Sequence, residues 1–334
     1  MRSKVSIVIP FKNTAHFLAE CLDSILNQSY QNWEVLAVND SSEDDSAALV
    51  ASYADNDGRI RCFENLGKGI IPALRTAYRM ASGAYITRMD SDDIMKPERL
   101  ERMVASLESH GRGGLAVGQV HYFSDRGISD GYERYENWLN QLTQNGTNFT
   151  EIYKECVIPS PCWMVERQDF ESCGGFENDR YPEDYDLTFR FYQYGLKVIP
   201  CGQILHLWRD YDTRTSRTHE HYAQNYFLDI KLHYFLRLEY EMERPLVIWG
   251  AGFKGKQIAK NLLAKALPFI WLCDNPKKID KKIYGQTLRH FSSLAALKRP
   301  QSIITVANQG AQQEIKAYLS VLKQQPMQDY YFFC

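Results

Sequence analysis

The sequence lacks a long hydrophobic run, and none of its apolar segments approaches the ~18 residues that a helix needs to cross a bilayer. The apolar start of the chain, residues 5–11, is too short for a secretion signal and is interrupted by Ser6 and Pro10. These features exclude the membrane-spanning class and predict a protein that stays in the cytoplasm. Peripheral contact with the inner face of the membrane is compatible with this pattern.

The sequence also lacks paired cysteines and an excess of charge. Its eight cysteines include no CxxC pair, so the spacing argues against a zinc site, and we expect reduced thiols that mostly fill the core. The 39 Lys and Arg nearly balance the 41 Asp and Glu, which gives a net charge of −2. No overall positive field attracts a nucleic acid, and none is expected as a partner. With 334 residues, the chain is long enough for about two domains.

What the first third of the sequence contains is an alternation of short apolar strands and amphipathic helices. Strands are expected at 5–9, 33–39, 59–64 and 84–89, and the helix at 15–28 has apolar pairs that recur every four residues. This alternation predicts parallel βαβ units with right-handed crossovers. In an open sheet of this kind, ligands bind beyond the carboxyl ends of the strands.

Three aspartates, Asp90, Asp92 and Asp93, follow one of these predicted strands. A helix is expected directly after them, with Pro97 at its first position, and Asp40 ends an earlier strand in the same way. The cluster is either a solvated turn or a site for Mg²⁺ or Mn²⁺, cations that bind carboxylate oxygens and substrate phosphates together. Its position at the carboxyl end of a strand favours the metal site.

Two further motifs lie in the middle of the chain. Glu183 and Asp184 begin a predicted helix, where the helix dipole favours acidic residues but where a carboxylate can also act as a general base. Arg209, Arg214 and Arg217 alternate with hydroxyl side chains. They fit either forked hydrogen bonds to phosphate or a solvated loop with Asp–Arg pairs.

Three histidines follow the acidic motifs, and each is either a metal ligand or, as we favour, a structural or exposed side chain: His206, His219 and His221. A long helix is expected over residues 220–243. Its segment KLHYFLR, at 231–237, combines aromatic and basic side chains. This segment fits packing against the first domain, which we favour, or contact with a membrane surface.

A second domain is expected from about Pro245. There Gly250, Gly252 and Gly255 form a GxGxxG motif between a predicted strand and helix, and Asp274 ends the next strand. This is the fingerprint of a dinucleotide site and makes NAD(P) a candidate cofactor. The domain has room for only one mononucleotide-sized half, however, and glycines at such a turn also allow close packing of strand and helix.

Together, these motifs resemble those of glycosyltransferase family 2, whose members are inverting enzymes with the GT-A fold. The resemblance rests on VSIVIPFKN at the start, the NDSSEDDS loop, the segment SGAYITRMDSDDIMKPERL, and GGF followed by PEDYDLTFRFYQYG. LWRDYDTRTSRT is similar to the arginine-rich segment of a bacterial subgroup, which also has a C-terminal domain that begins with a WGAG-type turn. The resemblance therefore covers nearly the whole chain.

The resemblance implies that the N-terminal half binds a nucleotide-diphosphate sugar. Pro10 and Asp40 would border the nucleotide base, with Asp40 accepting a hydrogen bond from its ring N–H. Asp90 and Asp92 would bind Mn²⁺ or Mg²⁺ and the nucleotide sugar, with Asp93 beside them.

The resemblance also implies the catalytic groups of the acceptor half. Asp184 would be the catalytic base, with Glu183 as its neighbour. Arg209, Arg214 and Arg217 would face the diphosphate or an anionic acceptor.

The sequence departs from the family pattern at two positions. Many members have an aromatic residue where this chain has Lys12, so base stacking is not carried over there. Relatives with the arginine-rich segment often have a histidine where this chain has Tyr211, so a role for histidine is not carried over either.

We therefore expect an α/β protein with a GT-A domain over 1–243, divided into a nucleotide-binding half at 1–112 and an acceptor half at 113–243. A small Rossmann-like domain is expected over 244–334. The expected activity is inverting, metal-dependent transfer of a hexose from a nucleotide-diphosphate sugar to a saccharide or lipid-linked saccharide, in cell-surface or exopolysaccharide synthesis. The alternatives are a regulatory protein that binds a nucleotide or nucleotide sugar through the GxGxxG domain, and an NAD-dependent oxidoreductase. The sequence is compatible with an oligomer.

Overall fold

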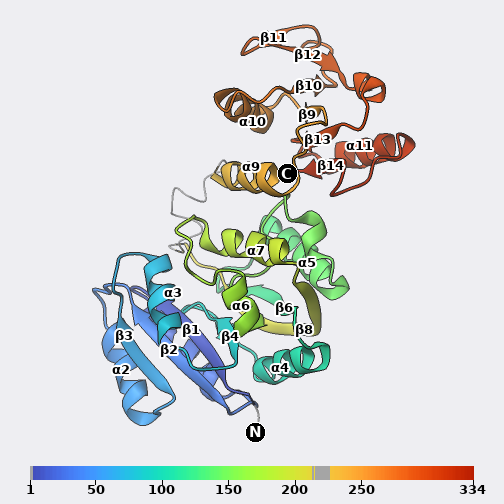
Figure 1. The fold of residues 1–334 in the computed structure, drawn as a ribbon. Helices are drawn as coiled ribbons and strands as arrows, with labels where there is room; N and C mark the ends of the chain where they lie inside the picture. Colours follow the sequence, from blue (N-terminus) through green and yellow to red (C-terminus); the bar gives the residue numbers. More distant parts are fainter. Residues whose placement is uncertain (1–2, 213, 215–225) are drawn as a thin grey trace. The chain divides into compact units, whose positions relative to one another are not determined.

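The computed structural model describes residues 3–212, Arg214 and residues 226–334 (Figure 1). The chain divides into two compact units. Of the described residues, the first unit holds those up to Phe149 together with Val157–Arg214, and the second holds Thr150–Cys156 and residues 226–334. The expected functional domains, 1–243 and 244–334, stay a prediction.

The first unit is built on an eight-stranded sheet in the order β3-β2-β1-β4-β7-β6-β8-β5. The first four of these strands are parallel, and the antiparallel strand β7 joins β4 to β6. The predicted α/β class is confirmed. The strands are β1 (Val5–Phe11), β2 (Trp33–Asn39), β3 (Ile60–Glu64), β4 (Tyr85–Arg88), β5 (Ile94–Met95), β6 (Gly114–Phe123), β7 (Trp163–Glu166) and β8 (Lys197–Arg209).

Several helices pack against this sheet through one apolar side. In α1, for example, Leu18, Cys21, Leu22 and Ile25 are fully buried, as the spacing of four predicts. The helices of the unit are α1 (Ala15–Leu26), α2 (Ser46–Asn56), α3 (Ile70–Arg79), α4 (Arg99–His110), α5 (Asp130–Asn145), α6 (Arg167–Ser172) and α7 (Glu183–Tyr194), and the 3₁₀ helix η1 (Asn148–Glu151) follows α5.

The start of α4 differs from the prediction. The helix begins at Arg99 with Glu98 as its N-cap residue, so Pro97 precedes the helix. The carbonyl of Pro97 accepts a hydrogen bond from the N–H of Ser29, and the N–H of Arg99 donates to the carbonyl of Lys96. These bonds make residues 96–99 a turn that is tied to the end of α1, and the helix can begin only after it.

The second unit contains a six-stranded sheet in the order β11-β12-β10-β9-β13-β14, in which β10, β9, β13 and β14 run parallel. In the part of the chain that the structure describes, in either unit, no helix is long and apolar enough to cross a membrane. The strands are β9 (Leu246–Trp249), β10 (Ile270–Cys273), β11 (Lys282–Ile283), β12 (Gln286–His290), β13 (Gln301–Ile304) and β14 (Tyr330–Phe332). The helices are α9 (Tyr226–Leu238), α10 (Phe253–Ala264), α11 (Gln309–Val321) and the 3₁₀ helix η3 (Phe291–Ala296).

Helix α9 contains the segment for which membrane contact is the alternative. Phe235 packs edge-on against Tyr153, Tyr331 and Phe333, and Lys231 is buried with its Nζ 2.8 Å from the carbonyl of Lys154. These partners belong to the second unit. The segment therefore packs inside that unit, and its aromatic side is not a membrane-facing surface.

Candidate active site

The acidic turn of residues 90–93 directly follows β4, whose neighbour is β1, and β1 in turn pairs with β2. Asp40 follows β2, and Pro10 lies near the end of β1, opposite Val38 in the register. Because the carboxyl ends of parallel strands meet at one edge of a sheet, the fold brings Pro10, Asp40 and the acidic turn to the same edge. Ligands of open α/β sheets bind at this edge.

Asp93 is the fully buried member of the turn. Its Oδ2 lies 2.9 Å from Nε2 of His206, and its Oδ1 accepts a hydrogen bond of 2.8 Å from the backbone N–H of Arg209. Nδ1 of His206 lies 3.0 Å from Nη1 of Arg99. Because a guanidinium only donates, Nδ1 accepts, and Nε2 carries the proton that points to Asp93. Both nitrogens of His206 are thus engaged, and the hypothesis that it binds metal is wrong for this arrangement.

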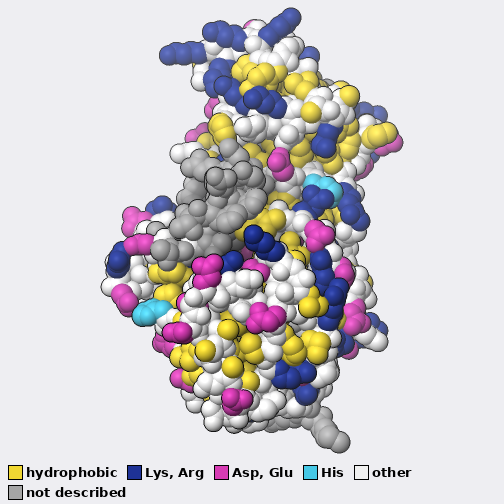
Figure 2. Space-filling model, turned by 90° about the vertical axis from the view of Figure 1, so that its left-hand side faces the viewer, with side chains coloured by type: hydrophobic (Ala, Val, Ile, Leu, Met, Phe, Trp, Pro, Cys, Tyr) yellow, Lys and Arg dark blue, Asp and Glu magenta, His cyan; other side chains and the backbone are white. Residues whose placement is uncertain are grey.

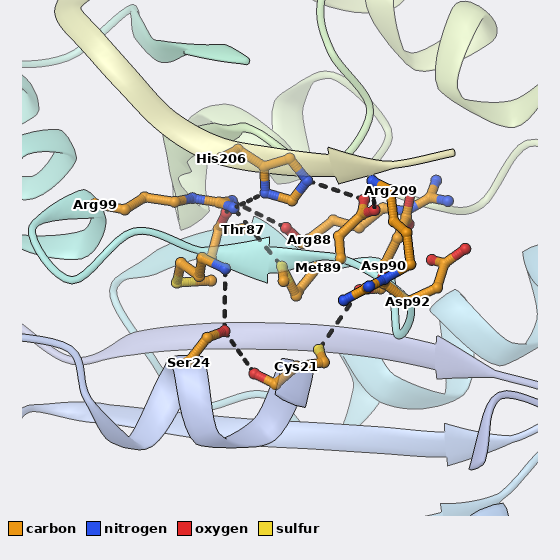
Figure 3. A network of polar contacts seen from close by, with 12 residues as sticks. Cys21, Ser24, Thr87, Arg88, Met89, Asp90, Asp92, Arg99, His206 and Arg209 are labelled. Atoms are coloured by element: carbon orange, nitrogen blue, oxygen red, sulfur yellow. Dashed lines mark hydrogen bonds and ion pairs between the residues drawn. The ribbon is translucent and has the colours of Figure 1, made fainter. Parts of the chain in front are cut away.

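Arg99 connects this buried network to the end of β4. Its Nη2 donates to the hydroxyl of Thr87 and to the carbonyl of Arg88, both at 3.1 Å. Burial lowers the pKa of His206 well below its usual value and raises that of Asp93. Hydrogen bonds from Arg99 thus join His206 to the end of β4, directly before the acidic turn, as Figure 3 shows.

Asp90 and Asp92 keep part of their surface exposed. Oδ1 of Asp90 accepts from Nε of Arg88 at 2.9 Å, and Oδ2 of Asp92 accepts from the hydroxyl of Tyr211 at 2.9 Å. Burial and the neighbouring Asp93 raise the pKa of Asp92 to about 6. Burial is the larger of these causes, so the raised pKa shows mainly that the charged carboxylate is poorly solvated, with a smaller contribution from the neighbouring carboxylate.

The donor set of this turn fits a hard divalent cation. No group of three or more His, Cys, Asp or Glu side chains that could hold a metal occurs among the described residues. Asp90 and Asp92 thus offer two carboxylates, and Mg²⁺ typically takes one or two carboxylates and completes its shell with phosphates and water. The residues present therefore fit a cation that is bound together with a phosphate group.

Arg88 joins this turn to the second acidic motif. It is the last residue of β4, and its Nη1 donates to Oε1 of Glu183 at 2.9 Å while its Nε binds Asp90. The side chains of Arg88 and Glu183 are only 7% and 9% exposed. A single buried guanidinium thus brings together two motifs that are far apart in the sequence.

Asp184 lies in the first turn of α7, directly after Glu183. It is half-buried, and its Oδ1 accepts a hydrogen bond of 2.7 Å from the backbone N–H of Tyr185. Burial and the charge of Glu183 raise the pKa of Asp184 to about 7, against the opposing charge of Arg88. A general base works best when its pKa lies near the working pH, and Asp184 meets this condition.

Asp40 is tied to the loop that follows β3. Its Oδ1 accepts from the side chain of Asn65 at 2.7 Å and from the backbone N–H of Gly69 at 2.9 Å. These bonds hold the 65–69 loop beside the end of β2. Contact of Asp40 and Pro10 with a nucleotide base stays a prediction.

The arginines of the arginine-rich segment differ in their contacts with the acidic turn. Nε of Arg209 donates to the carbonyl of Asp92 at 2.8 Å, its Nη2 pairs with Glu20, and its guanidinium lies over the rings of Phe17 and Phe123. This guanidinium therefore clamps the acidic turn.

Arg214 lies deeper, with 8% of its surface exposed. Its guanidinium lies over the ring of Trp208, and the carboxylates of Asp93 and Asp92 raise its pKa above the usual range. Arg217, His219 and His221 lie outside the described residues, so their predicted roles stay predictions.

The GxGxxG turn of the second unit is held by close packing. A Cβ on Gly255 would lie 2.1 Å from the carbonyl oxygen of Gly250, and one on Gly250 would lie 2.5 Å from the hydroxyl of Thr305. A Cβ on Gly252 would meet nothing within 4 Å, and Asp274 is exposed after β10. Two of the three glycines thus have a packing role, and a dinucleotide or other ligand at this turn stays a prediction.

Sequence reasoning missed Arg88, Arg99 and the contact of Tyr211 with Asp92. One signal was available, because Arg88 ends a strand that is otherwise buried. A charged residue is almost never fully buried without a partner, so an arginine at that position indicates a carboxylate from elsewhere in the fold. The sequence alone does not identify that carboxylate as Glu183.

The sequence and the fold of the chain were compared with those of known proteins. Among curated proteins, the chain is 27% identical over 213 residues to glycosyltransferase GlyA of Streptococcus pneumoniae, covering 62% of this chain and 30% of GlyA. It is 37% identical over 213 residues to a chondroitin synthase of Escherichia coli, covering 60% of this chain and 29% of the synthase. The chain therefore spans about a third of the length of these two relatives.

Two solved structures share the fold at low sequence identity. Staphylococcus aureus TarS 1–349, in complex with UDP-GlcNAc, has a TM-score of 0.53 and 15% identity, and the match covers 78% of this chain and 71% of TarS. The mannosyltransferase PcManGT of Pyrobaculum calidifontis, in complex with GDP-Man and Mn²⁺, has a TM-score of 0.50 and 15% identity, covering 98% and 82%. The model of the family "Glycosyl transferase family 2" matches residues 6–174, about half of the chain. The chain belongs to glycosyltransferase family 2.

Proposed function

We propose that this protein transfers a sugar from a nucleotide-diphosphate sugar to an acceptor hydroxyl, with inversion at the anomeric carbon. The observation that carries the proposal is the buried Arg88, which contacts Asp90 of the acidic turn and Glu183 beside Asp184. Arg88 thereby links the acidic turn to the start of α7, which supports assigning both to one site. Membership of the family and the UDP-GlcNAc and GDP-Man complexes of the structural neighbours support a nucleotide sugar as donor.

In this proposal, Asp184 accepts the proton of the acceptor hydroxyl while the hydroxyl oxygen forms a bond to the anomeric carbon. The bond from that carbon to the diphosphate breaks on the opposite face, and one displacement inverts the configuration. Asp90 and Asp92 would hold a divalent cation, which supplies positive charge to the leaving diphosphate when it is bound. Arg88 donates hydrogen bonds to both Asp90 and Glu183 and so holds the acidic turn close to the start of α7.

For the acceptor, we propose a chemical class and no specific molecule. A relative that covers 60% of the chain is named a chondroitin synthase, which supports a saccharide acceptor and a role in polysaccharide synthesis. We propose a hexose as the sugar that is transferred and a saccharide or a lipid-linked saccharide as the acceptor.

Donor binding is tested first by thermal shift with UDP-, GDP-, dTDP- and CMP-sugars, each with and without Mn²⁺. A ligand that binds only the folded state stabilises it by about 2.7 kcal/mol at a hundredfold excess over its dissociation constant. We expect a Mn²⁺-dependent shift for one nucleotide class that is lost in Asp92→Ala. Stabilisation by none of these sugars, together with stabilisation by NAD(H), would instead favour a binding or redox role for the second unit.

The base is tested with Asp184→Asn, which keeps the shape of the side chain and removes its basicity. We expect turnover to fall by about 10²–10⁴, with donor binding unchanged in the thermal-shift assay. Glu177→Gln is the matched control, because it neutralises an exposed carboxylate upstream of α7. Near-normal turnover of Asp184→Asn would remove Asp184 from the base role.

A further inference from the structure

The C-terminal part of the chain has a positive charge that the proposed transfer reaction does not use. Residues 246–334 contain 13 Lys and Arg against 4 Asp and Glu, a net charge of +9, whereas residues 1–245 have a net charge of −11. The small net charge of the whole chain therefore conceals two regions of opposite sign. Such a strong local excess favours an anionic partner.

Part of this charge gathers on one side of α10. Phe253, Lys256 and Lys260 are three and four residues apart, so they lie on the same side of the helix. Nζ of Lys260 lies 5.3 Å from the ring centre of Tyr284, which belongs to the turn between β11 and β12. This contact places the basic side of α10 beside the β11–β12 hairpin.

The hairpin that contains Tyr284 has further lysines at its start. Lys281 and Lys282 are exposed at its start, and Nζ of Lys278 donates at 2.8 Å to the carbonyl of Ala251, just before α10. Asp274 and Asp280 are the acidic residues of this loop, against four lysines at 277, 278, 281 and 282. We name the surface the basic aromatic face and define it by Phe253, Lys256, Lys260, Lys281, Lys282 and Tyr284.

The basic aromatic face also exposes apolar rings. Phe253 is 55% exposed and Tyr284 is 44% exposed, although large apolar side chains are usually buried. In Figure 2, Lys and Arg side chains surround an apolar area at the top of the view, within the second unit. The surface thus combines positive charge with aromatic side chains.

We propose that the basic aromatic face binds the surface of a membrane that contains anionic lipids. Lysines near such a surface are attracted to the headgroups, and aromatic rings settle at the boundary between headgroups and acyl chains. A soluble polyanion would satisfy the lysines but would offer no apolar layer for Phe253. The inference goes beyond the proposed transfer reaction and rests on none of its residues.

The test is co-sedimentation of the full chain with vesicles of phosphatidylcholine alone and with 30% phosphatidylglycerol. We expect binding only to the anionic vesicles and weaker binding at higher salt, because surface charges are screened. Lys260→Gln/Lys281→Gln/Lys282→Gln should weaken binding more than tenfold, since each basic residue near the surface contributes about fivefold. Phe253→Ser should weaken it about tenfold at every salt concentration, because an apolar contact is lost.

The control variant Lys298→Gln/Arg299→Gln/Lys323→Gln removes the same charge before β13 and after α11, outside the basic aromatic face. It should weaken binding less than threefold. Equal losses in the two triple variants, or no binding to anionic vesicles at low salt, would overturn the proposal. Tighter binding to heparin that Phe253→Ser leaves unchanged would overturn it in favour of a soluble polyanion. Both triple variants should keep the thermal shift with the sugar nucleotide. A loss of membrane binding can then be told apart from a failure of the proposed function.

Discussion

Replacing Arg88 with methionine tests whether the two acidic motifs form one site. Methionine keeps most of the length and apolar bulk of the side chain but removes the bonds of 2.9 Å to Asp90 and to Glu183. Glu183, which is 9% exposed, would then be a buried carboxylate without its cation. Its other oxygen, Oε2, already has no hydrogen-bond partner among the described residues.

The expected loss follows from this burial. Removing one partner of a buried ion pair typically costs about 3–5 kcal/mol, because the other charge stays buried and unpaired. We expect Arg88→Met to lose about that much free energy of unfolding of the first unit at pH 8, measured by urea denaturation.

The same variant should change the pH dependence of turnover. Burial raises the pKa of Asp184 to about 7, and the positive charge of Arg88 opposes this rise. Without Arg88, the pKa of Asp184 rises further, so the acid limb of the kcat/KM profile should move to higher pH. Adding Glu183→Gln to the variant should recover part of the lost stability and move the acid limb back to lower pH, because the charge of Glu183 raises the pKa of Asp184.

Arg59→Met is the matched control, because Arg59 pairs with Asp57 at the surface, where the two side chains are 35% and 23% exposed. Exposed pairs contribute about 0–1 kcal/mol, and this pair is remote from the acidic turn. The reasoning is refuted if Arg88→Met is as stable as the parent at pH 8 and its kcat/KM profile is unchanged.

Three further predictions concern single groups. Tyr211→Phe removes the hydroxyl that lowers the pKa of Asp92, so that pKa should rise above 6 and Mn²⁺-dependent donor binding at pH 6.5 should weaken several-fold in a thermal-shift titration. Gly255→Ala puts a Cβ 2.1 Å from a carbonyl oxygen and should destabilise the second unit by at least about 1–3 kcal/mol, detected as faster proteolysis there while donor binding is retained. The folded-state pKa of Asp184, about 7, lies above its ordinary 3.8, so the folded state binds more protons between these values. Stability should therefore fall as pH rises from 4 to 7, by up to about 4 kcal/mol from this group, and Asp184→Asn should remove that part of the slope in urea denaturation.

The strands and helices of the first third could be predicted because their apolar spacing is strong. The strand expected at 33–39 is β2 (Trp33–Asn39), buried along its whole length. By contrast, α5 (Asp130–Asn145) was not predicted, because it buries only Leu139 and Thr143 among its sixteen residues. A helix with so narrow an apolar side gives little periodic signal. Its neighbour β6 (Gly114–Phe123) was missed with it.

The sequence predicts the motifs of the candidate site, but it does not predict which of their side chains contact each other. The spacing of the acidic residues and their positions at strand ends and helix starts are properties of the local sequence. The pairing of Arg88 with Glu183 spans 95 positions and depends on how β4 and α7 meet in the fold. The same is true of His206, which local sequence offers equally as a metal ligand or as a buried partner of Asp93.

The three aspartates of the turn are equivalent in the sequence, and burial makes them different. Asp93 is enclosed and fully engaged, while Asp90 and Asp92 keep exposed surface. Among the described residues, the arginines that bind the turn or act on its charge are Arg88, Arg99, Arg209 and Arg214. These cations already offset much of the negative charge, so a divalent ion alone would add an excess of positive charge to a buried site. An ion that binds together with a diphosphate is accompanied by negative charge, which offsets its own positive charge. We therefore expect Mn²⁺ without a sugar nucleotide to give little thermal stabilisation, and a full shift with Mn²⁺ alone would contradict this account of the charge balance.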